Sequence, residues 1–471
     1  MIRTLLLSSA VAIAVAGCTN TPLPALSPGD VPAAFEQKAP LNAPVWPAHD
    51  WWTNYGDPQL SALMQQAEAN NLDIAQAAAR LRQADARARQ AGAALLPQVG
   101  AAASVTPQYG QVGSTSAQET DFNAGLQVSY ELDFWGKNRD ALDSAQAARA
   151  ASLADRQTVA LTVTSGVATT YFQLLSLRER IAVARANLKS SQDILNLVQR
   201  RVSAGYSAPA DLTQQRAALA AEQAVLPQLE QQELETRDAL AILLGKPPEG
   251  FAVSGEGLGA LSPPAVAAGL PSELLVRRPD IAAAEANLKG AHADLAAARA
   301  AFFPSINLTA SGGVAYPALG AVVNTLPGTG LALLGTATIA QAIFDGGQRE
   351  GKVEETKARE EELLAAYRAA VLSSFSDVEN ALGAFAHLSA QEAALHEQAV
   401  QAEKVLQAAQ RKYLAGSADF LVVTDGQRAL YTARDQLSDI RRARLAASVA
   451  LFKALGGGFN TAAASPQQGY P

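Results

Sequence analysis

Apolar residues recur along the chain with two periods, one of seven residues and one of two. The seven-residue pattern follows Arg139 and returns after Arg349, although Glu392 interrupts the second run. This spacing is typical of a coiled-coil seam. The run from Arg139 to Arg201 would form a helix about 95 Å long, which has to pack beside other helices. In the first run the seam positions are Ala160, Val167, Leu174, Ile181, Leu188, Leu195 and Val202, together with Val163, Thr170, Leu177, Ala184, Ser191 and Val198.

The two-residue pattern is clearest in residues 121–134. Phe122, Ala124, Leu126, Val128, Tyr130, Leu132 and Phe134 alternate there with mostly polar residues. Residues 305–316 alternate in the same way, 98–109 do so more weakly, and 331–344 are poorly polarised. Such segments fit transmembrane β-strands, and half-buried strands of a soluble sheet are the alternative. Residues 109–121 and 316–330, rich in Gly, Ser, Thr and Pro, are predicted to be loops outside the cell.

The second half of the chain repeats the first. The segment beginning "LDIAQAAARL" at Leu72 matches "PDIAAAEANL" from Pro279 without a gap, and "GKNR" matches "GGQR" about 210 residues later. Each half is predicted to contain a helix, two strands and a hairpin of long helices. The hairpin turns are expected at residues 203–211 and 414–420, where Gly205 and Gly416 would end one helix. Asp211 and Asp419 would cap the next helix.

A proline marks the change from helix to strand in each half. Pro97 and Pro304 stand between a helical run and an alternating segment, where proline stops a helix and makes the preceding residue extended.

Four strands cannot close a barrel, and open sheet edges cannot persist in lipid. Two chains would give a filled barrel, whereas three would give twelve strands and an open lumen. Three chains would also gather the long helices into a ring that continues the lumen as a tube.

The first residues, "MIRTLLLSSAVAIAVAGC", are typical of a secretion signal whose apolar stretch is too short to span a bilayer. Cys18, the one cysteine of the chain, follows Val15-Ala16-Gly17. This arrangement resembles a bacterial lipobox, in which the cysteine becomes the lipid-bearing first residue. The alternative is an ordinary signal peptide with a free thiol. Thr19 after the cysteine, in place of an aspartate, would imply sorting to the outer membrane by the habit of such lipoproteins.

Composition narrows the function class. With 49% hydrophobic and 17% charged residues the chain is not disordered, and a net charge of -7 argues against a nucleic-acid partner. The sequence contains no phosphate-loop pattern and no metal spacing around its four histidines, so we expect no enzyme activity, cofactor or metal. Trp51-Trp52 is interpreted as an anchor for the N-terminal segment, with a ligand platform as the alternative. Residues 277–280 are interpreted as a helix start, with a binding patch as the alternative.

Several motifs together resemble the outer-membrane factor (TolC-like) family, and within it the NodT/OprM-type efflux lipoproteins. They are the lipobox at Cys18, "DWWTNYGDPQLSALMQQAEANNLDIAQAAARLRQADA" from Asp50, "YELDFWGKNR", "LLVRRPDIAAAEANL", "AAFFPSINLTAS" and "IFDGGQR". The resemblance covers nearly the whole mature chain. It implies an α/β membrane protein that forms a homotrimer with a twelve-stranded outer-membrane β-barrel and a periplasmic α-barrel tunnel. The tunnel would dock on a periplasmic adaptor and an inner-membrane pump of the resistance-nodulation-division type. It also implies that the hairpin tips narrow the tunnel and contact the adaptor, with Gly205, Tyr206, Asp211, Gly416, Asp419 and Phe420 as the candidate residues. Asp211 and Asp419 would then contribute rings of three carboxylates around the pore, with helix capping as the alternative.

The expected divisions follow from the repeat and the resemblance. They are a signal peptide (1–17), a lipidated N-terminal and equatorial part (18–71), a first repeat (72–245), an equatorial linker (246–277), a second repeat (278–456) and a tail (457–471). The expected function is the exit duct of a tripartite efflux pump. The alternatives are the exit channel of a protein-secretion system and a periplasmic coiled-coil scaffold lipoprotein without a pore. The sequence does not name the substrate, because a duct passes what its pump supplies.

Overall fold

A computed structural model describes residues 31–36, 47–112, 115–255, 257–259, 261–264, 271–317 and 330–459. The signal sequence, Cys18, the tail from residue 460 and most of the predicted loop 316–330 lie outside these residues. The chain forms two compact units, which are described one at a time. The sheet unit contains residues 85–149 and 285–368. The hairpin unit contains the described residues of 31–84, 150–284 and 369–459.

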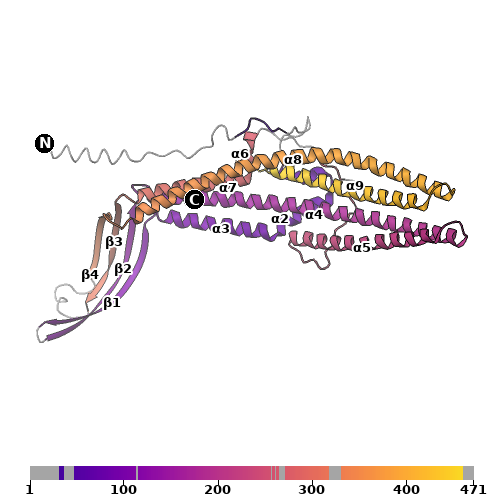
Figure 1. Ribbon diagram of the computed structural model, residues 1–471. Coiled ribbons are helices and arrows are strands. Elements are labelled where there is room, and N and C mark those ends of the chain that lie inside the picture. The colour runs from indigo at the N-terminus through magenta and orange to yellow at the C-terminus, as the bar shows by residue number, and fades with distance from the viewer. Residues whose placement is uncertain are drawn as a thin grey trace. The chain divides into compact units, whose positions relative to one another are not determined.

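The sheet unit is built on four antiparallel strands in the order β1-β2-β3-β4 (Figure 1). The strands are β1 (Gln98–Val112), β2 (Thr115–Leu132), β3 (Ser305–Pro317) and β4 (Gly330–Ala340). Helices α3 (Leu72–Ala93) and α7 (Pro279–Ala300) lead into β1 and β3, and helices α4 (Lys137–Ser203) and α8 (Gln348–Leu414) follow β2 and β4. Each half of the sequence therefore supplies one hairpin of strands, and β2 and β3 join the two halves.

The alternating pattern located the four strands, but it misplaced their ends. The predicted loop 109–121 is largely a paired hairpin, because β1 reaches Val112 and pairs it with Thr115 of β2. Backbone pairing does not require apolar side chains, and Thr suits a strand, so the ladder continues beyond the apolar residues. At the other end β2 stops at Leu132. Asp133 there accepts hydrogen bonds from the backbone N–H groups of Asn138 (2.9 Å) and Arg139 (2.8 Å) and begins α4. Residues 341–344 likewise lie beyond β4.

The hairpin unit contains two pairs of long helices. The C-terminal part of α4 precedes α5 (Pro209–Leu243), and that of α8 precedes α9 (Phe420–Ala454). The predicted seam is confirmed where Val167, Leu174, Leu177 and Val198 are fully buried. Nearer the turn Ile194 is buried instead of Leu195, because a 3.6-residue helix drifts against a seven-residue repeat. Each fully buried leucine contributes roughly 1.5–3 kcal/mol to stability.

Shorter helices complete the hairpin unit. They are η2 (Trp51–Tyr55), α2 (Pro58–Asn70), η3 (Pro271–Glu273) and α6 (Leu274–Arg277). Asp57 caps α2, because its Oδ1 accepts from the backbone N–H groups of Gln59 (2.7 Å) and Leu60 (3.3 Å). None of the described helices combines the length and the hydropathy that a membrane-spanning helix needs.

Candidate functional site

The register of the sheet places the apolar residues of all four strands on one face. Leu126 of β2 stands opposite Ala101 of β1 and Gly312 of β3, and Val128 stands opposite Val99 and Ala310. This face consists of Val99, Ala101, Ala103, Val105, Ala124, Leu126, Val128, Tyr130, Leu132, Ile306, Leu308, Ala310, Gly312, Leu333, Gly335, Ala337 and Ile339. The weak patterns of β1 and β4 thus become part of one continuous apolar surface when the strands pair.

The opposite face of the sheet is polar. It carries Gln98, Ser104, Thr106, Gln127, Ser129, Glu131, Asn307, Thr309, Ser311, Thr336 and Thr338, with Ala102, Leu334 and Ala340 as apolar exceptions. Glu131 is paired with Lys137, with 2.6 Å between Oε1 and Nζ. Leu126 is 59% exposed, Leu333 81% and Ile339 71%, so the described residues leave the apolar face uncovered. Such an amphipathic sheet suits lipid on one side and water on the other.

The two prolines lie at the helix-to-strand junctions. Helix α3 ends at Ala93 and Pro97 directly precedes β1, while α7 ends at Ala300 and Pro304 directly precedes β3. Trp135, to which the sequence assigned no role, joins the two halves at this level. Its indole N–H donates to the carbonyl of Pro304 (2.8 Å), and its ring stacks on Phe303 with 4.7 Å between centroids. The connection between β2 and α4 is therefore packed against the junction between α7 and β3.

Glycines end the descending helices at both hairpin tips, as predicted. Gly205 has φ 76° and Gly416 has φ 75°, a left-handed conformation that favours glycine. The next residue in each turn donates back to the helix, Tyr206 N–H to Arg201 (2.8 Å) and Ser417 N–H to Lys412 (2.9 Å). The two turns thus have the same hydrogen-bond pattern, as expected for duplicated segments.

The acids of the tips do not cap their helices as expected. Helix α5 begins at Pro209 after Ala208, so Asp211 lies inside its first turn. Proline presets the helical φ angle, and the helix therefore starts before the aspartate. Asp419 occupies the cap position of α9, but its side chain makes no capping hydrogen bond. Asp419 is exposed and Asp211 is half-buried.

The two aromatic residues predicted at the tips differ. Tyr206 is 77% exposed, whereas Phe420 is 2% exposed. Phe420 packs on Tyr413, with 5.3 Å between ring centroids, in a cluster with Val198 and Val423. The Phe420 side chain therefore belongs to the core of the hairpin.

A link that the sequence analysis missed joins the two tips. The Arg201 guanidinium lies over the Tyr413 ring at 4.8 Å from the centroid. The Tyr413 hydroxyl and Ser207 Oγ are 2.9 Å apart, and Arg201 Nη1 donates to the carbonyl of Leu414 (3.4 Å). The first hairpin contributes Arg201 and Ser207, and the second contributes Tyr413 and Leu414. Each residue looks ordinary in the sequence, and only the folded chain brings them together.

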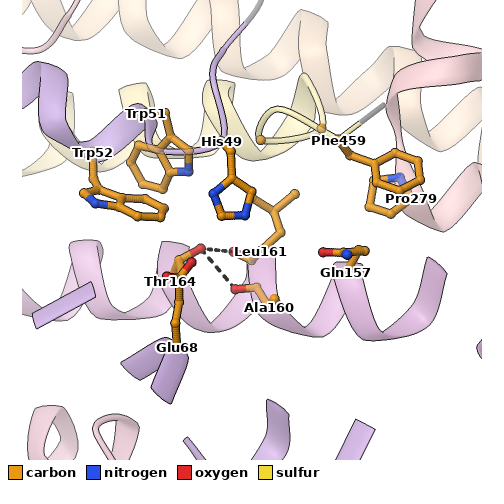
Figure 2. Close-up of a pocket in the computed structure, with 12 residues that line it drawn as sticks. His49, Trp51, Trp52, Glu68, Gln157, Ala160, Leu161, Thr164, Pro279 and Phe459 are labelled. Carbon is orange, nitrogen blue, oxygen red and sulfur yellow. Dashed lines mark hydrogen bonds between the residues drawn. The ribbon is translucent and has the colours of Figure 1, made fainter. Parts of the chain in front are cut away.

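Trp51 and Trp52 pack as an anchor. They are 1% and 5% exposed, and Trp51 stacks on Phe452 of α9 with 5.2 Å between centroids. Figure 2 shows both rings beside His49 in a pocket that Gln157 and Thr164 of α4 also line. The Thr164 hydroxyl donates to the carbonyls of Ala160 (3.0 Å) and Leu161 (3.2 Å) of its own helix. It is therefore not available to donate to a ligand in the pocket.

Arg278 explains the "RRPD" segment as a helix start. Pro279 is the first residue of α7, and Arg278, 8% exposed, donates to Asp280 through Nε (3.0 Å) and Nη2 (2.7 Å). It also reaches Asp377 of α8 (2.9 Å) and the carbonyl of Ala454 in α9 (3.2 Å). Burial alone would raise the pKa of Asp280, but the Arg278 guanidinium holds it below its usual value. This internal network leaves Arg278 no open face for a ligand.

One histidine has a carboxylate partner. His292 of α7 is half-buried against α8, with its Nδ1 2.6 Å from Glu360 Oε1. The carboxylate gives the half-buried imidazole a hydrogen-bond partner. Among the described residues no group of histidine, cysteine and acidic side chains could hold a metal ion.

Comparisons with known proteins agree with this geometry. The chain matches the family described as "Outer membrane efflux protein" over residues 63–246 and 270–457. It is 40% identical over 449 residues to the pyoverdine export outer membrane protein OpmQ of Pseudomonas putida, covering 93% of this chain and 94% of the relative. It is 29% identical over 460 residues to the cation efflux system protein CusC of Escherichia coli, covering 96% and 98% of the two chains.

The fold also matches solved channels. The structure of the outer-membrane channel OprN superposes with a TM-score of 0.85 at 28% identity, covering 93% of this chain and 98% of that one. The long helical hairpins and the four strands of this chain therefore have the tunnel-and-barrel fold that the sequence predicted. The chain belongs to the outer membrane efflux protein family, and it is an outer-membrane protein.

Proposed function

We propose that three copies of this chain form the outer-membrane exit duct of a tripartite efflux pump. The observation that carries the proposal is the alignment of apolar residues on one face of the sheet. The edge strands β1 and β4 each pair on one side only within the described residues, so their outer edges are open. Lipid covers the apolar face, and β4 of one copy pairs with β1 of the next. Three copies close twelve strands around an open lumen lined by hydroxyl and amide side chains.

The chain meets its other partners at its two ends. Cys18 carries the lipid anchor in the outer membrane. The hairpin tips meet a periplasmic adaptor, through which an inner-membrane pump of the resistance-nodulation-division type delivers its substrates. Gly205, Tyr206, Gly416 and the acids Asp211 and Asp419 form the surface that narrows the tunnel and contacts the adaptor. The exposed Tyr206 and Asp419 side chains support this role.

The substrates are small toxic compounds or drugs, in keeping with the relative named for cation efflux. A second candidate is a siderophore of the pyoverdine type, which the 40% and 39% identity to two pyoverdine export proteins favours. The polar face of the sheet suits either class of substrate. Among the residues named above for this face only Glu131 is charged, and it is paired with Lys137. Passage of secreted proteins is the less favoured use of the same fold.

Deletion of the gene in its own host tests the proposal. Minimum inhibitory concentrations of a panel of drugs and cations, and mass spectrometry of siderophores retained in the periplasm, are compared with those of the complemented strain. The proposal predicts increased susceptibility or siderophore retention, restored by the intact chain. Loss of a secreted protein, with unchanged susceptibility and no retained small molecule, would instead support the secretion channel.

A further inference from the structure

The helices of the sheet unit follow the order of the strands to which they connect (Figure 1). Helix α3 packs on α4, where Arg149 pairs with Asp85, and a methyl group on Gly92 would lie 3.6 Å from Leu142. Helix α4 packs on α7, where a methyl group on Gly290 would lie 3.5 Å from Ala147. His292 of α7 then contacts Glu360 of α8. The order is therefore α3-α4-α7-α8, and the outer flanks of α3 and α8 lie at the two open edges of the unit.

The outer flank of α3 carries positive charge. Its buried face is marked by Ala84 and Ala88. Successive residues of a helix are rotated by about 100°. Around the helix axis Arg87 therefore lies about 100° from the buried face on one side and Arg89 about 100° from it on the other, so that both border the outer surface. Both arginines are exposed. No carboxylate lies between them on the flank, and neither forms an ion pair within the described part of the chain.

The outer flank of α8 carries negative charge. Glu360, which faces α7, and Thr356 mark its inner face. Glu354 and Glu355 lie about 130° to either side of this face, and both are exposed. Glu355 has one exposed partner on the same helix, Lys352 (2.9 Å), and no cation is found on the flank between the two glutamates.

The two charged pairs also lie at the same level. At 1.5 Å per residue, Arg89 and Arg87 lie about 6 and 9 Å from the end of α3 that joins the sheet. Glu354 and Glu355 lie about 9 and 10 Å from the corresponding end of α8. Like charges recur one heptad further along each helix, at Arg80 and Arg82 and at Glu361 and Glu362. Of these, Arg80 also lies near Asp155 of α4, and Glu362 also pairs with Arg359 on its own helix. Two antiparallel helices can match such rows over their length.

We infer that Arg87 and Arg89 on α3 of one copy form a charge-matched seam with Glu354 and Glu355 on α8 of the neighbouring copy. The inference rests on the proposed assembly, in which β1 and β4 of adjacent copies pair and so bring α3 of one copy beside α8 of the next. The partner of this surface is a second copy of the chain. Because opposite charges meet only when unlike edges face each other, the seam also selects the head-to-tail closure that a ring requires.

Charge reversal and its compensation test the seam in the full-length protein, extracted in detergent. Arg87→Glu with Arg89→Glu should lower the fraction of trimer in native mass spectrometry at least tenfold at low salt, since like charges then oppose each other. Glu354→Arg with Glu355→Arg should do the same. The variant with all four changes should recover the trimer. Lys357→Glu, an exposed substitution on α8 outside the flank, should leave the trimer fraction unchanged.

The outcomes separate the seam from the assembly on which it rests. If the wild type forms trimers and both double variants do so equally well, the seam is wrong while the proposed duct stands. The pairing is also overturned if the double variants lose the trimer and the fourfold variant does not recover it. That result would show that trimer formation needs these side chains but does not depend on their opposite charges. A wild-type chain that stays monomeric in native mass spectra and passes no current contradicts the proposed duct itself.

Discussion

Leu126 and Gln127 are neighbours in sequence but face opposite sides of the sheet. Leu126→Arg turns a charge toward lipid, which costs about 2–4 kcal/mol near the midplane for each copy. Gln127→Arg turns the same charge toward water and should be tolerated. Heat-stable trimer in membrane fractions measures both effects. Equal losses for the two variants would show that the faces have been assigned incorrectly.

Glu222 is an acid in the α4–α5 hairpin, where burial raises its pKa although Ser191 and Asn187 hydrogen-bond to its carboxylate. Its Oε2 is buried without a hydrogen-bond partner among the described atoms. A folded pKa above the unfolded value means that the stability contribution is complete below the unfolded pKa, near 4.3, and is lost as pH rises through the folded value. Ionised Glu222 therefore destabilises the hairpin at neutral pH.

Glu222→Gln should remove this cost. We expect the variant to unfold at a higher temperature than the wild type at pH 7, by on the order of 1 kcal/mol. The difference should be small at pH 3, below the unfolded pKa, where the Glu222 carboxyl is protonated in the folded and the unfolded state. Thermal unfolding followed by circular dichroism measures the change, and Glu235→Gln on the exposed face of the same helix is the matched control. A stability difference that does not vary with pH would contradict the assigned ionisation.

At the scale of helices and strands, the sequence predicts what local chemistry determines. Gly205 and Gly416 end their helices because of a backbone conformation, and Pro97 and Pro304 lie at junctions that proline itself favours. The length of the β1–β2 hairpin was not predictable in the same way, since cross-strand pairing from Val112 to Thr115 does not depend on apolar alternation. The Asp133 cap of α4 was masked by its position at the end of an alternating run.

The Arg201–Tyr413 link should hold the two hairpin tips together. Tyr413→Phe keeps the ring and removes the hydroxyl that meets Ser207, which should weaken the link by about 0.5–1.5 kcal/mol. Arg201→Ala removes the guanidinium over the ring, worth about 0.5–1 kcal/mol. Amide hydrogen exchange in residues 204–208 and 415–419 should accelerate up to tenfold in either variant. Tyr206→Phe, at an exposed position in the same turn, is the control, and unchanged exchange in both test variants would contradict the link.

Asp419 should influence ions at the tip. In a threefold assembly three copies of its carboxylate would meet near one axis and favour cations. Asp419→Ala should lower the preference for cations, measured as the reversal potential across a salt gradient, without loss of trimer. The absence of a side-chain capping bond predicts that helix α9 stays intact in this variant. Unchanged reversal potential would place the narrowest ring at other tip residues, with Tyr206 the next to test.

At the scale of the whole molecule, the duplication was visible in the sequence because both halves retain the same order of motifs. The contacts that join the halves were not visible. The β2–β3 pairing, the Trp135 bond to Pro304 and the Arg278 network each bring together residues far apart in sequence. Such contacts depend on the register of the strands and on the rotation of each helix about its axis. A periodic pattern limits the possible registers and rotations but does not determine them. The polar networks were the least predictable part, since their members resemble ordinary surface residues.

The central claim is that copies of this chain assemble into an open transmembrane duct. The most direct test is single-channel recording of the purified full-length protein in planar lipid bilayers, with its mass determined in the same preparation. The account predicts trimers that give discrete, reproducible conductance steps, and a Leu126→Arg protein that inserts far less often. A protein of confirmed outer-membrane fold that forms stable trimers yet passes no current in any preparation, with its hairpin tips either intact or loosened by Tyr413→Phe, would contradict it.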